Sequence, residues 1–208
     1  MLLLSTAYLA PVSYYAHLYA AASAADDLCE HYVKQTYRNR CYIATPSGPQ
    51  ALTIPVVRDG AARTATRDIR ISDHGNWRHL HWNALASAYE SSPYFEYYAD
   101  DFRPLYEKRF EFLVDFNDAL RRLVLDELTL PITVGRTENY VAAPPPGVAD
   151  LRNAFSPKFP APAGFVPVPY YQVFAARTGF LPNLSIADLL FNMGPESRLV
   201  LRQSLPAH

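Results

Sequence analysis

The sequence predicts one α+β domain, with a mixed β-sheet in the N-terminal third, helices in the middle and a Pro-rich arm that packs back on the body. Short apolar or alternating runs between turn residues fill residues 2–72, as strands do. Apolar residues at helical spacing dominate residues 76–128. Prolines gather over residues 139–171 beside aromatic residues that a free linker usually lacks, which favours a docked arm.

The length and the charge balance exclude several classes of protein. A chain of 208 residues suits a single domain over residues 1–208, and its hydrophobic fraction of 50% supplies a core. Its 19 Lys and Arg residues nearly balance 20 Asp and Glu residues, so bulk charge recruits neither nucleic acid nor an acidic membrane. No stretch approaches the roughly 20 apolar residues of a membrane span. We therefore expect a cytoplasmic protein without nucleic-acid or membrane partners.

The N-terminal segment predicts a strand, a helix and a second strand. Leu2–Tyr8 is apolar, Pro11 suits a first helical turn, and residues 12–23 are rich in Ala and Tyr. Leu28–Tyr32 is expected to return as a strand parallel to the first, through a right-handed crossover. The opening resembles a signal peptide, but no Lys or Arg precedes Lys34, so the basic region of such a peptide is missing.

The next region predicts a hairpin and a further strand. Tyr42–Ala44 and Ala51–Val57 flank a turn at residues 46–49. Asp59-Gly60 predicts another turn. Asp68–Ser72 alternates polar and apolar residues, as a half-buried strand does.

Two helices are predicted in the middle of the chain. The first covers Trp77–Glu90 and ends at the break of residues 91–93. Asp100 or Asp101 is expected to cap the second, with Pro104 in its first turn. The apolar stripe of this second helix comprises Tyr106, Phe110, Leu113, Phe116, Leu120 and Val124. The charged residues between them are interpreted as a solvated face.

The C-terminal part, residues 172–208, predicts one short helix after the arm. Ser185–Asp188 resembles a capping box in which Asp replaces Glu. Leu189 and the residues after it continue the apolar face, and Gly194-Pro195 is a strong stop signal.

A basic block at residues 30–40 is the strongest indication of a binding site. If the block is extended, alternate side chains share one face. That face would carry Glu30, Tyr32, Lys34, Thr36, Arg38 and Arg40. Three cations in one row repel each other unless solvent or an anion lies between them. The pattern predicts a small anionic ligand, such as a nucleotide sugar, although an edge strand kept soluble by its charges explains it equally well.

Each residue of this block has an expected role. Arg38 and Arg40 offer planar forks for phosphate or carboxylate, and Lys34 offers a mobile point charge. Asn39 could bind a polar group of the ligand or bond the backbone in a turn. Glu30 could act as a general base on an amine or hydroxyl, or simply pair with the cations.

Five segments of the chain resemble motifs of the WbqC-like protein family and follow in the same order. They are Tyr8–Tyr15, which resembles the family's YLPP-x-x-YF start, Lys34–Arg40 (K-x-x-Y-x-NR), Gly48–Val56 (G-x-x-x-LTVPV), Ala88–Phe95 (AY-x-x-SPYF) and Asn183–Leu190 (NLSI-x-DLL). They span nearly the whole chain, and their combination is specific. Ala10 stands where the family usually has proline, and the arm matches the family poorly.

The resemblance implies a function in bacterial surface-polysaccharide synthesis, because the family takes its name from such gene clusters. We expect an enzyme of O-antigen-type sugar-precursor metabolism, with acyl or aminoacyl transfer to an amino sugar as the reaction. Glu30 is the expected catalytic residue, while Tyr37 shapes the pocket and Tyr14 and Tyr94 contact the substrate. The alternative is a non-catalytic protein that binds a metabolite or, through its arm, a partner protein.

Other catalytic chemistry has weaker support. Cys29 and Cys41 could supply a thiol nucleophile, with His17 or His31 as its base, but both cysteines border apolar residues and are interpreted as core thiols. The remaining candidate metal ligands are His74, His79 and His81. They lack a recognised zinc spacing, so we predict no metal and no cofactor.

Overall fold

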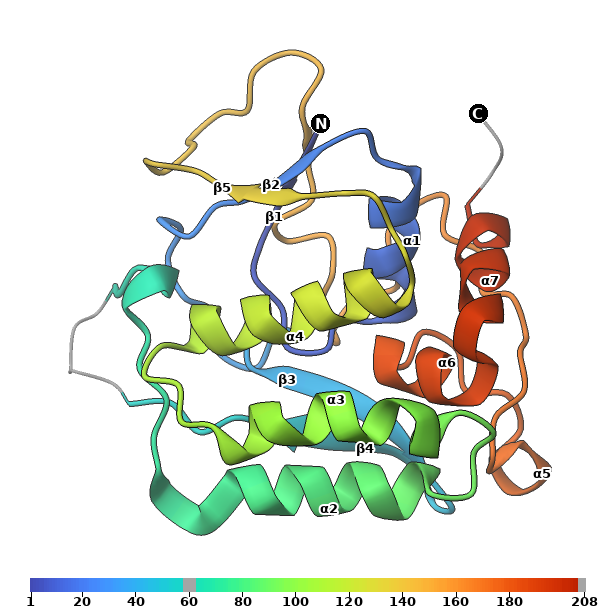
Figure 1. Cartoon of the computed structure of the whole chain (residues 1–208). Helices are drawn as coiled ribbons and strands as arrows, with labels where there is room; N and C mark the ends of the chain where they lie inside the picture. The colour runs from blue at the N-terminus through green and yellow to red at the C-terminus, as the bar shows by residue number, and fades with distance from the viewer. Residues whose placement is uncertain (58–62, 206–208) are drawn as a thin grey trace.

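A computed structural model describes residues 1–57 and 63–205, and it places a parallel sheet and a β-hairpin in one α+β arrangement (Figure 1). The sheet has four strands in the order β5-β2-β1-β6, and the separate hairpin pairs β3 with β4. The predicted fold class is therefore confirmed. The turn expected at Asp59-Gly60 lies outside the described residues.

The first two strands form a parallel pair around a crossover helix, as predicted. β1 is Leu2–Leu4, α1 is Val12–Ala20 and β2 is Ala24–Asp26. The expected strand at Leu28–Tyr32 is wrong, because β2 ends before it and residues 27–39 form turns and irregular backbone. The apolar pattern misses β2 because small alanines and a buried aspartate compose it.

The other two strands of this sheet come from far along the chain. β5, Val134–Arg136, pairs with β2, and β6, Ala149–Asp150, pairs with β1. β6 belongs to the Pro-rich arm, whose Phe155 is buried in the core, so the prediction that the arm packs back is confirmed. The sequence did not predict these strands because they are too short to show a period.

The hairpin agrees with the sequence, whereas the strand predicted after it does not form. β3 is Arg40–Thr45 and β4 is Gly48–Thr53. Asp68–Ser72 contributes only isolated bridges, although Ile69 and Ile71 are buried in alternation as expected. One side of this segment pairs with the connection before α4 instead of a regular strand.

Three helices follow, and their boundaries correct one prediction. α2 is Trp77–Tyr89, α3 is Phe95–Glu107 and α4 is Leu113–Glu127. α3 thus starts before Asp100 and carries Pro104 in its interior, where the proline is exposed. The predicted apolar stripe is divided between α3 and α4, because residues 108–112 leave the helix and the Glu111 carbonyl accepts a hydrogen bond from the Ile71 N–H.

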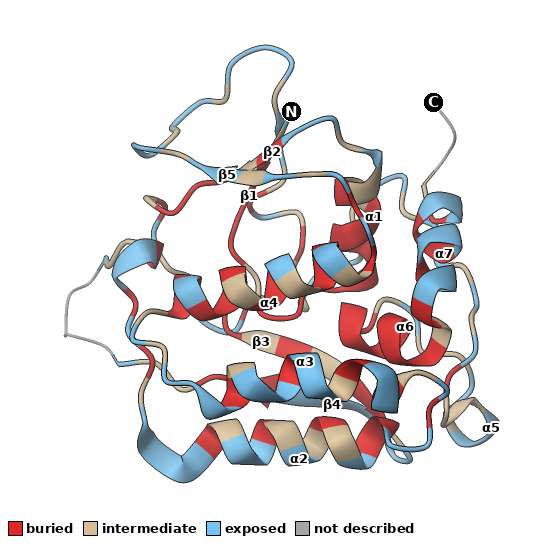
Figure 2. Ribbon diagram, in the orientation of Figure 1, coloured by how far each residue is buried: buried red, intermediate tan, exposed pale blue. Residues whose placement is uncertain are grey.

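The C-terminal helices complete the core. Their bounds are α5 Ala175–Thr178, α6 Ile186–Met193 and α7 Ser197–Gln203, and the short 3-10 helices are Thr66–Asp68, His74–Asn76 and Gly194–Glu196. α6 is almost wholly buried (Figure 2) and contacts α1, α2, α3 and β3. Among the described residues, no helix has the length and apolar character that a membrane span requires.

Ser185 caps α6 as predicted, but Asp188 does not complete the capping box. The Ser185 hydroxyl accepts a hydrogen bond from the Ala187 N–H at 3.2 Å. The Asp188 carboxylate instead accepts hydrogen bonds from Tyr89, at 2.9 Å, from Tyr170 near the end of the arm and from Gln172 just after it. Tertiary contacts therefore override the local capping pattern.

Candidate functional site

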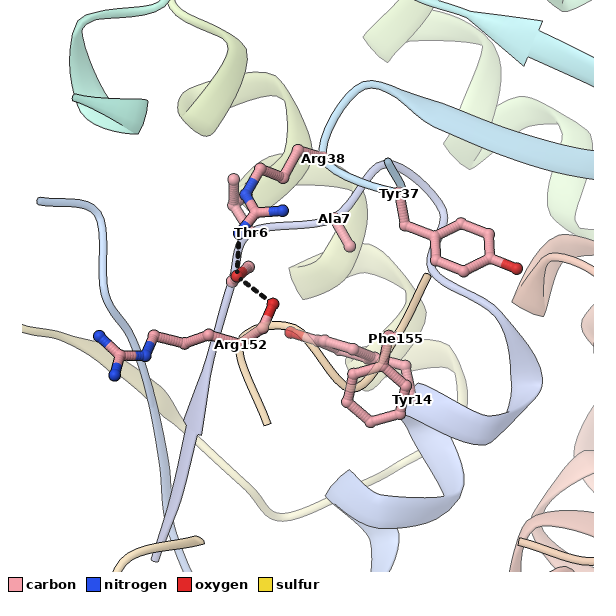
Figure 3. A pocket seen from close by; sticks show the side chains of 8 residues that line it. Thr6, Ala7, Tyr14, Tyr37, Arg38, Arg152 and Phe155 are labelled. Carbon is pink, nitrogen blue, oxygen red and sulfur yellow. Dashed lines mark hydrogen bonds between the residues drawn. The ribbon is translucent and has the colours of Figure 1, made fainter. Parts of the chain in front are cut away.

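A small cavity lies where the strand order of the parallel sheet reverses. The chain proceeds outward from β1 to β2 and β5, then returns to the other side of β1 as β6. In parallel sheets, ligands bind at the carboxyl ends of the strands beside such a switch point. The hollow, here called the switch-point cavity, has about 230 Å³ of empty space that opens to solvent, and its enclosed part of about 10 Å³ admits about one water molecule. It is lined by Ser5, Thr6, Ala7, Tyr14, Tyr37, Arg38, Arg152 and Phe155 (Figure 3).

Ser5, directly after β1, joins two sides of this cavity. Its hydroxyl donates to the backbone carbonyl of Arg152 at 2.7 Å and accepts from Nη2 of Arg38 at 2.8 Å (Figure 3). The Arg38 side chain is only 4% exposed, and Nε and Nη2 each donate to one Glu30 oxygen at 2.8 Å. Because Glu30 neutralises it, Arg38 presents a hydrogen-bond donor to the cavity rather than an unpaired charge.

Two further buried arginines bind the aspartates at the end of β2. Nη1 of Arg152 lies 2.7 Å from Asp27, and Nη1 of Arg121 on α4 lies 2.6 Å from Asp26. Figure 3 shows the Arg152 guanidinium directed away from the cavity, toward which only its backbone carbonyl turns. Arg152 also pairs with Asp150, and that hydrogen bond raises the pKa of Arg152. At the carboxyl edge of the sheet, each of the buried arginines Arg38, Arg121 and Arg152 is therefore paired with at least one carboxylate.

Aromatic side chains form the apolar wall of the cavity. The rings of Tyr14 and Phe155 meet edge to face at a centroid distance of 5.1 Å. Burial raises the pKa of Tyr37 to about 12, and burial likewise raises the pKa of Tyr14. Both phenols stay protonated near neutral pH, so they can donate hydrogen bonds but cannot serve as bases.

The predicted cationic row is not assembled in the structure. Lys34 is exposed, Arg38 is buried, and Arg40 begins β3, where its Nε donates to the Thr53 hydroxyl at 3.0 Å. The alternation fails because the block is not extended: residues 34–39 form bends and turns, and Gln35 has a φ of 58°. The three cations therefore lie in three different environments.

Asn39 and Tyr94 lie outside the cavity. Nδ2 of Asn39 donates to the Ile54 carbonyl at 2.9 Å, a buried contact that ties the turn to the end of the hairpin. Tyr94 precedes α3 and packs its ring on Gly194, where a Cβ would meet the ring at 2.5 Å. Gly194 also has a φ of 52°, so glycine is required there for two reasons.

The candidate base and nucleophiles do not line the cavity either. Glu30 lies behind Arg38, with both of its oxygens engaged. Cys41 is buried, and burial raises the pKa of its thiol. Cys29 is half-buried, and its sulfur accepts from Nη1 of Arg67 at 3.4 Å. In the described part of the chain, no cluster of His, Cys, Asp and Glu could hold a metal ion.

Five lining residues were not predicted, and one of them is Ala7. Ser5 and Thr6 had a usable signal, because they are polar residues placed directly after an apolar strand. Arg152 and Phe155 had none, since their place beside β1 depends on the pairing of β6 with a strand almost 150 residues earlier. The cavity unites them with Tyr14, Tyr37 and Arg38, which were predicted to bind substrate.

Comparison with known proteins identifies the family. A model of the WbqC-like protein family matches residues 7–145, more than half of the chain. This chain belongs to the WbqC-like protein family. A similar protein is the uncharacterized protein Rv1507c of Mycobacterium tuberculosis (strain ATCC 25618 / H37Rv), which is 28% identical over 200 residues, an alignment that covers 85% of each chain. No solved structure matches. The family match includes Glu30 and Arg38 but ends before Arg152 and Phe155, which complete the switch-point cavity.

Proposed function

We propose that this WbqC-like protein is an enzyme of surface-polysaccharide precursor metabolism that binds a sugar at the switch-point cavity. The main support is the composition of this cavity, where aromatic rings meet hydroxyl groups, the neutralised Arg38 side chain and the backbone carbonyl of Arg152. Aromatic rings suit the apolar faces of a sugar, and fixed hydrogen-bonding groups suit its hydroxyls. The family name, drawn from surface-polysaccharide gene clusters, agrees with such a substrate.

The charges near the cavity favour an amino sugar over a free phosphate. Arg38 is paired with one carboxylate, and Arg152 with the two carboxylates of Asp27 and Asp150. A phosphate at this edge would gain little attraction, because the charges of both arginines are already neutralised by carboxylates. An ammonium or hydroxyl group would not be repelled, because no unpaired cation faces it. The nucleotide part of a linked sugar would therefore lie outside the cavity.

The proposed reaction is transfer of an acyl or aminoacyl group to the amine of that sugar. The amine nitrogen attacks the donor's carbonyl carbon, the new C–N bond forms, and the bond to the donor's leaving group breaks. A base accepts the proton that the nitrogen loses. Glu30 is the proposed base, and it becomes available when a ligand hydroxyl replaces it as a partner of Arg38.

A second candidate is a non-catalytic protein that binds the same kind of metabolite. One observation favours it: the cavity lining, as far as the chain is described, includes neither a carboxylate nor a thiol. Binding would depend on the residues that line the cavity, whereas catalysis would depend on Glu30 behind them. Two experiments therefore distinguish an enzyme from a non-catalytic binding protein.

The first experiment tests binding by thermal shift, with the wild type and Ala7→Leu against amino sugars, nucleotide-linked sugars and inorganic phosphate. Ala7 lines the cavity, so a leucine there fills it (Figure 3). Ala86→Leu, on half-buried α2 surface away from the cavity, is the matched control. We expect an amino sugar to raise the melting temperature of the wild type and of the control, but not of Ala7→Leu. An equal rise in all three, or none in the wild type, would contradict the proposed site.

The second experiment tests catalysis with a sugar that binds. The protein, the sugar and an activated acyl or aminoacyl donor are incubated together, and the N-acylated product is measured by mass spectrometry. We expect product from the wild type and at least a hundredfold less from Glu30→Gln, assayed at a temperature where circular dichroism shows the destabilised variant still folded and with the thermal shift by the sugar retained. Binding without turnover of any donor would support the non-catalytic candidate instead.

A further inference from the structure

A second concave site, remote from the parallel sheet, lies between the first half of α2 and the C-terminal end of α3. This α2–α3 groove has a volume of about 510 Å³, within the usual range of small-molecule sites. α2 and α3 lie side by side, below β1 and β2 in the view of Figure 1. Its lining includes Arg78, His79, Trp82, Arg103, Tyr106 and Arg109.

Two arginines of this groove share one carboxylate. Nη1 of Arg78 lies 2.6 Å from one oxygen of Asp73, and Nη1 of Arg109 lies 3.5 Å from the other. The Arg78 guanidinium also stands 4.8 Å from the centre of the Trp77 ring, and its side chain is only 14% exposed. Arg78 is therefore held in place before any ligand arrives, which lowers the entropy lost on binding.

The groove carries an excess of positive charge. Its three arginines face two carboxylates, those of Asp73 and Glu107, in a chain whose net charge is −1. The hydrogen bond from Arg78 lowers the pKa of Asp73, so Asp73 stays ionised and keeps the two cations together. A guanidinium has five N–H donors, and the Arg109 side chain is 82% exposed. Donors of Arg109 therefore stay accessible to an incoming anion.

An aromatic surface lies beside these cations. The Trp82 ring contacts the rings of Phe95 and Tyr106, each at a centroid distance of 5.9 Å. The Tyr106 hydroxyl is bonded to that of the buried Tyr8 at 2.9 Å, which fixes its orientation. Trp82 itself is half-exposed, so part of its indole surface is open to solvent. A rigid flat surface next to paired arginines suits a molecule that joins a ring to a phosphate group.

We propose that the α2–α3 groove binds an organic phosphate that carries a flat ring, of which a nucleoside diphosphate is the simplest class. The phosphates bind N–H donors of Arg109 and Arg78 other than those directed at Asp73, and the ring lies against Trp82. This inference does not rest on the proposed sugar site, because the two sites share no lining residue. Ala7→Leu should leave this binding unchanged, so failure of either proposal can be recognised separately.

Calorimetric titration of the full chain with UDP, ADP, uridine and inorganic pyrophosphate tests this proposal. At low salt, we expect a nucleoside diphosphate to bind at least tenfold more tightly than uridine or pyrophosphate, because only it engages both parts of the groove. Trp82 is one of two tryptophans in the chain, so its fluorescence should change on binding. The change should disappear in Trp82→Phe.

Arg109→Gln tests the role of the cation with little risk to folding, since an exposed ion pair contributes little to stability. We expect it to weaken binding at least fivefold. Arg122→Gln is the matched control: Arg122 is also exposed, at 73%, and pairs with Asp118 on α4 away from the groove. The proposal is overturned if neither nucleotide binds, if pyrophosphate binds equally well, or if Arg109→Gln retains wild-type affinity.

Discussion

At the scale of single residues, the Glu30–Arg38 pair shows that the basic block of residues 30–40 is not a row of surface cations. An extended chain would have placed Arg38 in a row of surface cations, but the turn at residues 34–39 buries it against Glu30. Sequence reasoning identified both residues and gave Glu30 two interpretations, a general base or a partner of the cations. The structure shows Glu30 paired with Arg38. The direction of a long side chain depends on backbone geometry that local composition does not determine.

Breaking this pair should destabilise the fold strongly. Arg38→Met leaves a buried carboxylate without its partner, and Glu30→Gln leaves a buried guanidinium without charge compensation. Each single change is expected to lower the free energy of unfolding by about 3–5 kcal/mol. The double variant should recover part of that loss, because no unpaired charge remains. Urea unfolding of the four proteins measures this coupling, and strictly additive losses would contradict it.

His81 predicts a sensitivity to acid. Its Nδ1 is 3.0 Å from the Tyr8 hydroxyl, and burial lowers the pKa of His81 to about 4 from an ordinary value of 6.5. The unfolded chain therefore binds the proton more readily, and stability is lost as the pH falls from 6.5 through about 4. The full loss is about 3 kcal/mol.

Unfolding free energies at pH 7 and pH 4, compared between the wild type and His81→Leu, isolate this contribution. Subtraction removes the pH dependence of other groups, which both proteins share. An NMR titration of the folded protein with His81 protonating near its ordinary pKa would contradict the prediction.

At the scale of elements, the arm segment is held by a small polar cluster around α6. Nε2 of Gln172 donates to the Leu181 carbonyl and to Asp188, both at 2.9 Å. Tyr170 donates to the same Asp188 oxygen at 2.6 Å. Burial raises the pKa of Asp188, so its three donors, Tyr89, Tyr170 and Gln172, compensate for a carboxylate placed in an unfavourable environment.

Gln172→Ala should loosen the arm without unfolding the body. It removes both bonds from Nε2 and the bond from the Leu181 N–H to Oε1. We expect amide exchange around residues 165–181 to accelerate at least tenfold, while exchange in α4 stays slow. Hydrogen exchange with mass spectrometry measures both regions. Equal acceleration in both would indicate global destabilisation rather than release of the arm.

Element by element, the accuracy of sequence reasoning depended on how local the determining contacts are. The hairpin and α2 were predicted because turn residues and helical spacing lie within the segments themselves. The start of α3 was misplaced because Pro104 usually marks a first turn, whereas this helix tolerates it on an exposed face. β5 and β6 are strands only by virtue of their distant partners.

At the scale of the whole molecule, the family match and the folding unit differ in extent. The match ends at residue 145, but β6, Arg152 and the buried helix α6 lie beyond it. A chain truncated after residue 145 would lack the partner of Asp27 and one edge of the core. We expect it to show no cooperative unfolding transition by circular dichroism. A sharp transition near that of the full chain would contradict this expectation.

The fold class was predictable because periodic patterns and turn residues decide it, and these are local properties. The candidate site was predictable only in part. Tyr14, Tyr37 and Arg38 were identified from their own segments, whereas Arg152 and Phe155 reach the cavity through a long-range pairing that one sequence alone does not reveal.

The central position of β1 also constrains how the chain folds. This first strand lies between β2 and β6, and its register to β6 joins Leu2 to Ala149. During synthesis, the apolar N-terminus has a partner on one side only until nearly three quarters of the protein has left the ribosome. Closing so large a loop is slow, and an open strand edge can pair with other chains meanwhile. We expect refolding yield to fall as protein concentration rises, and a chaperone that shields apolar segments to restore it.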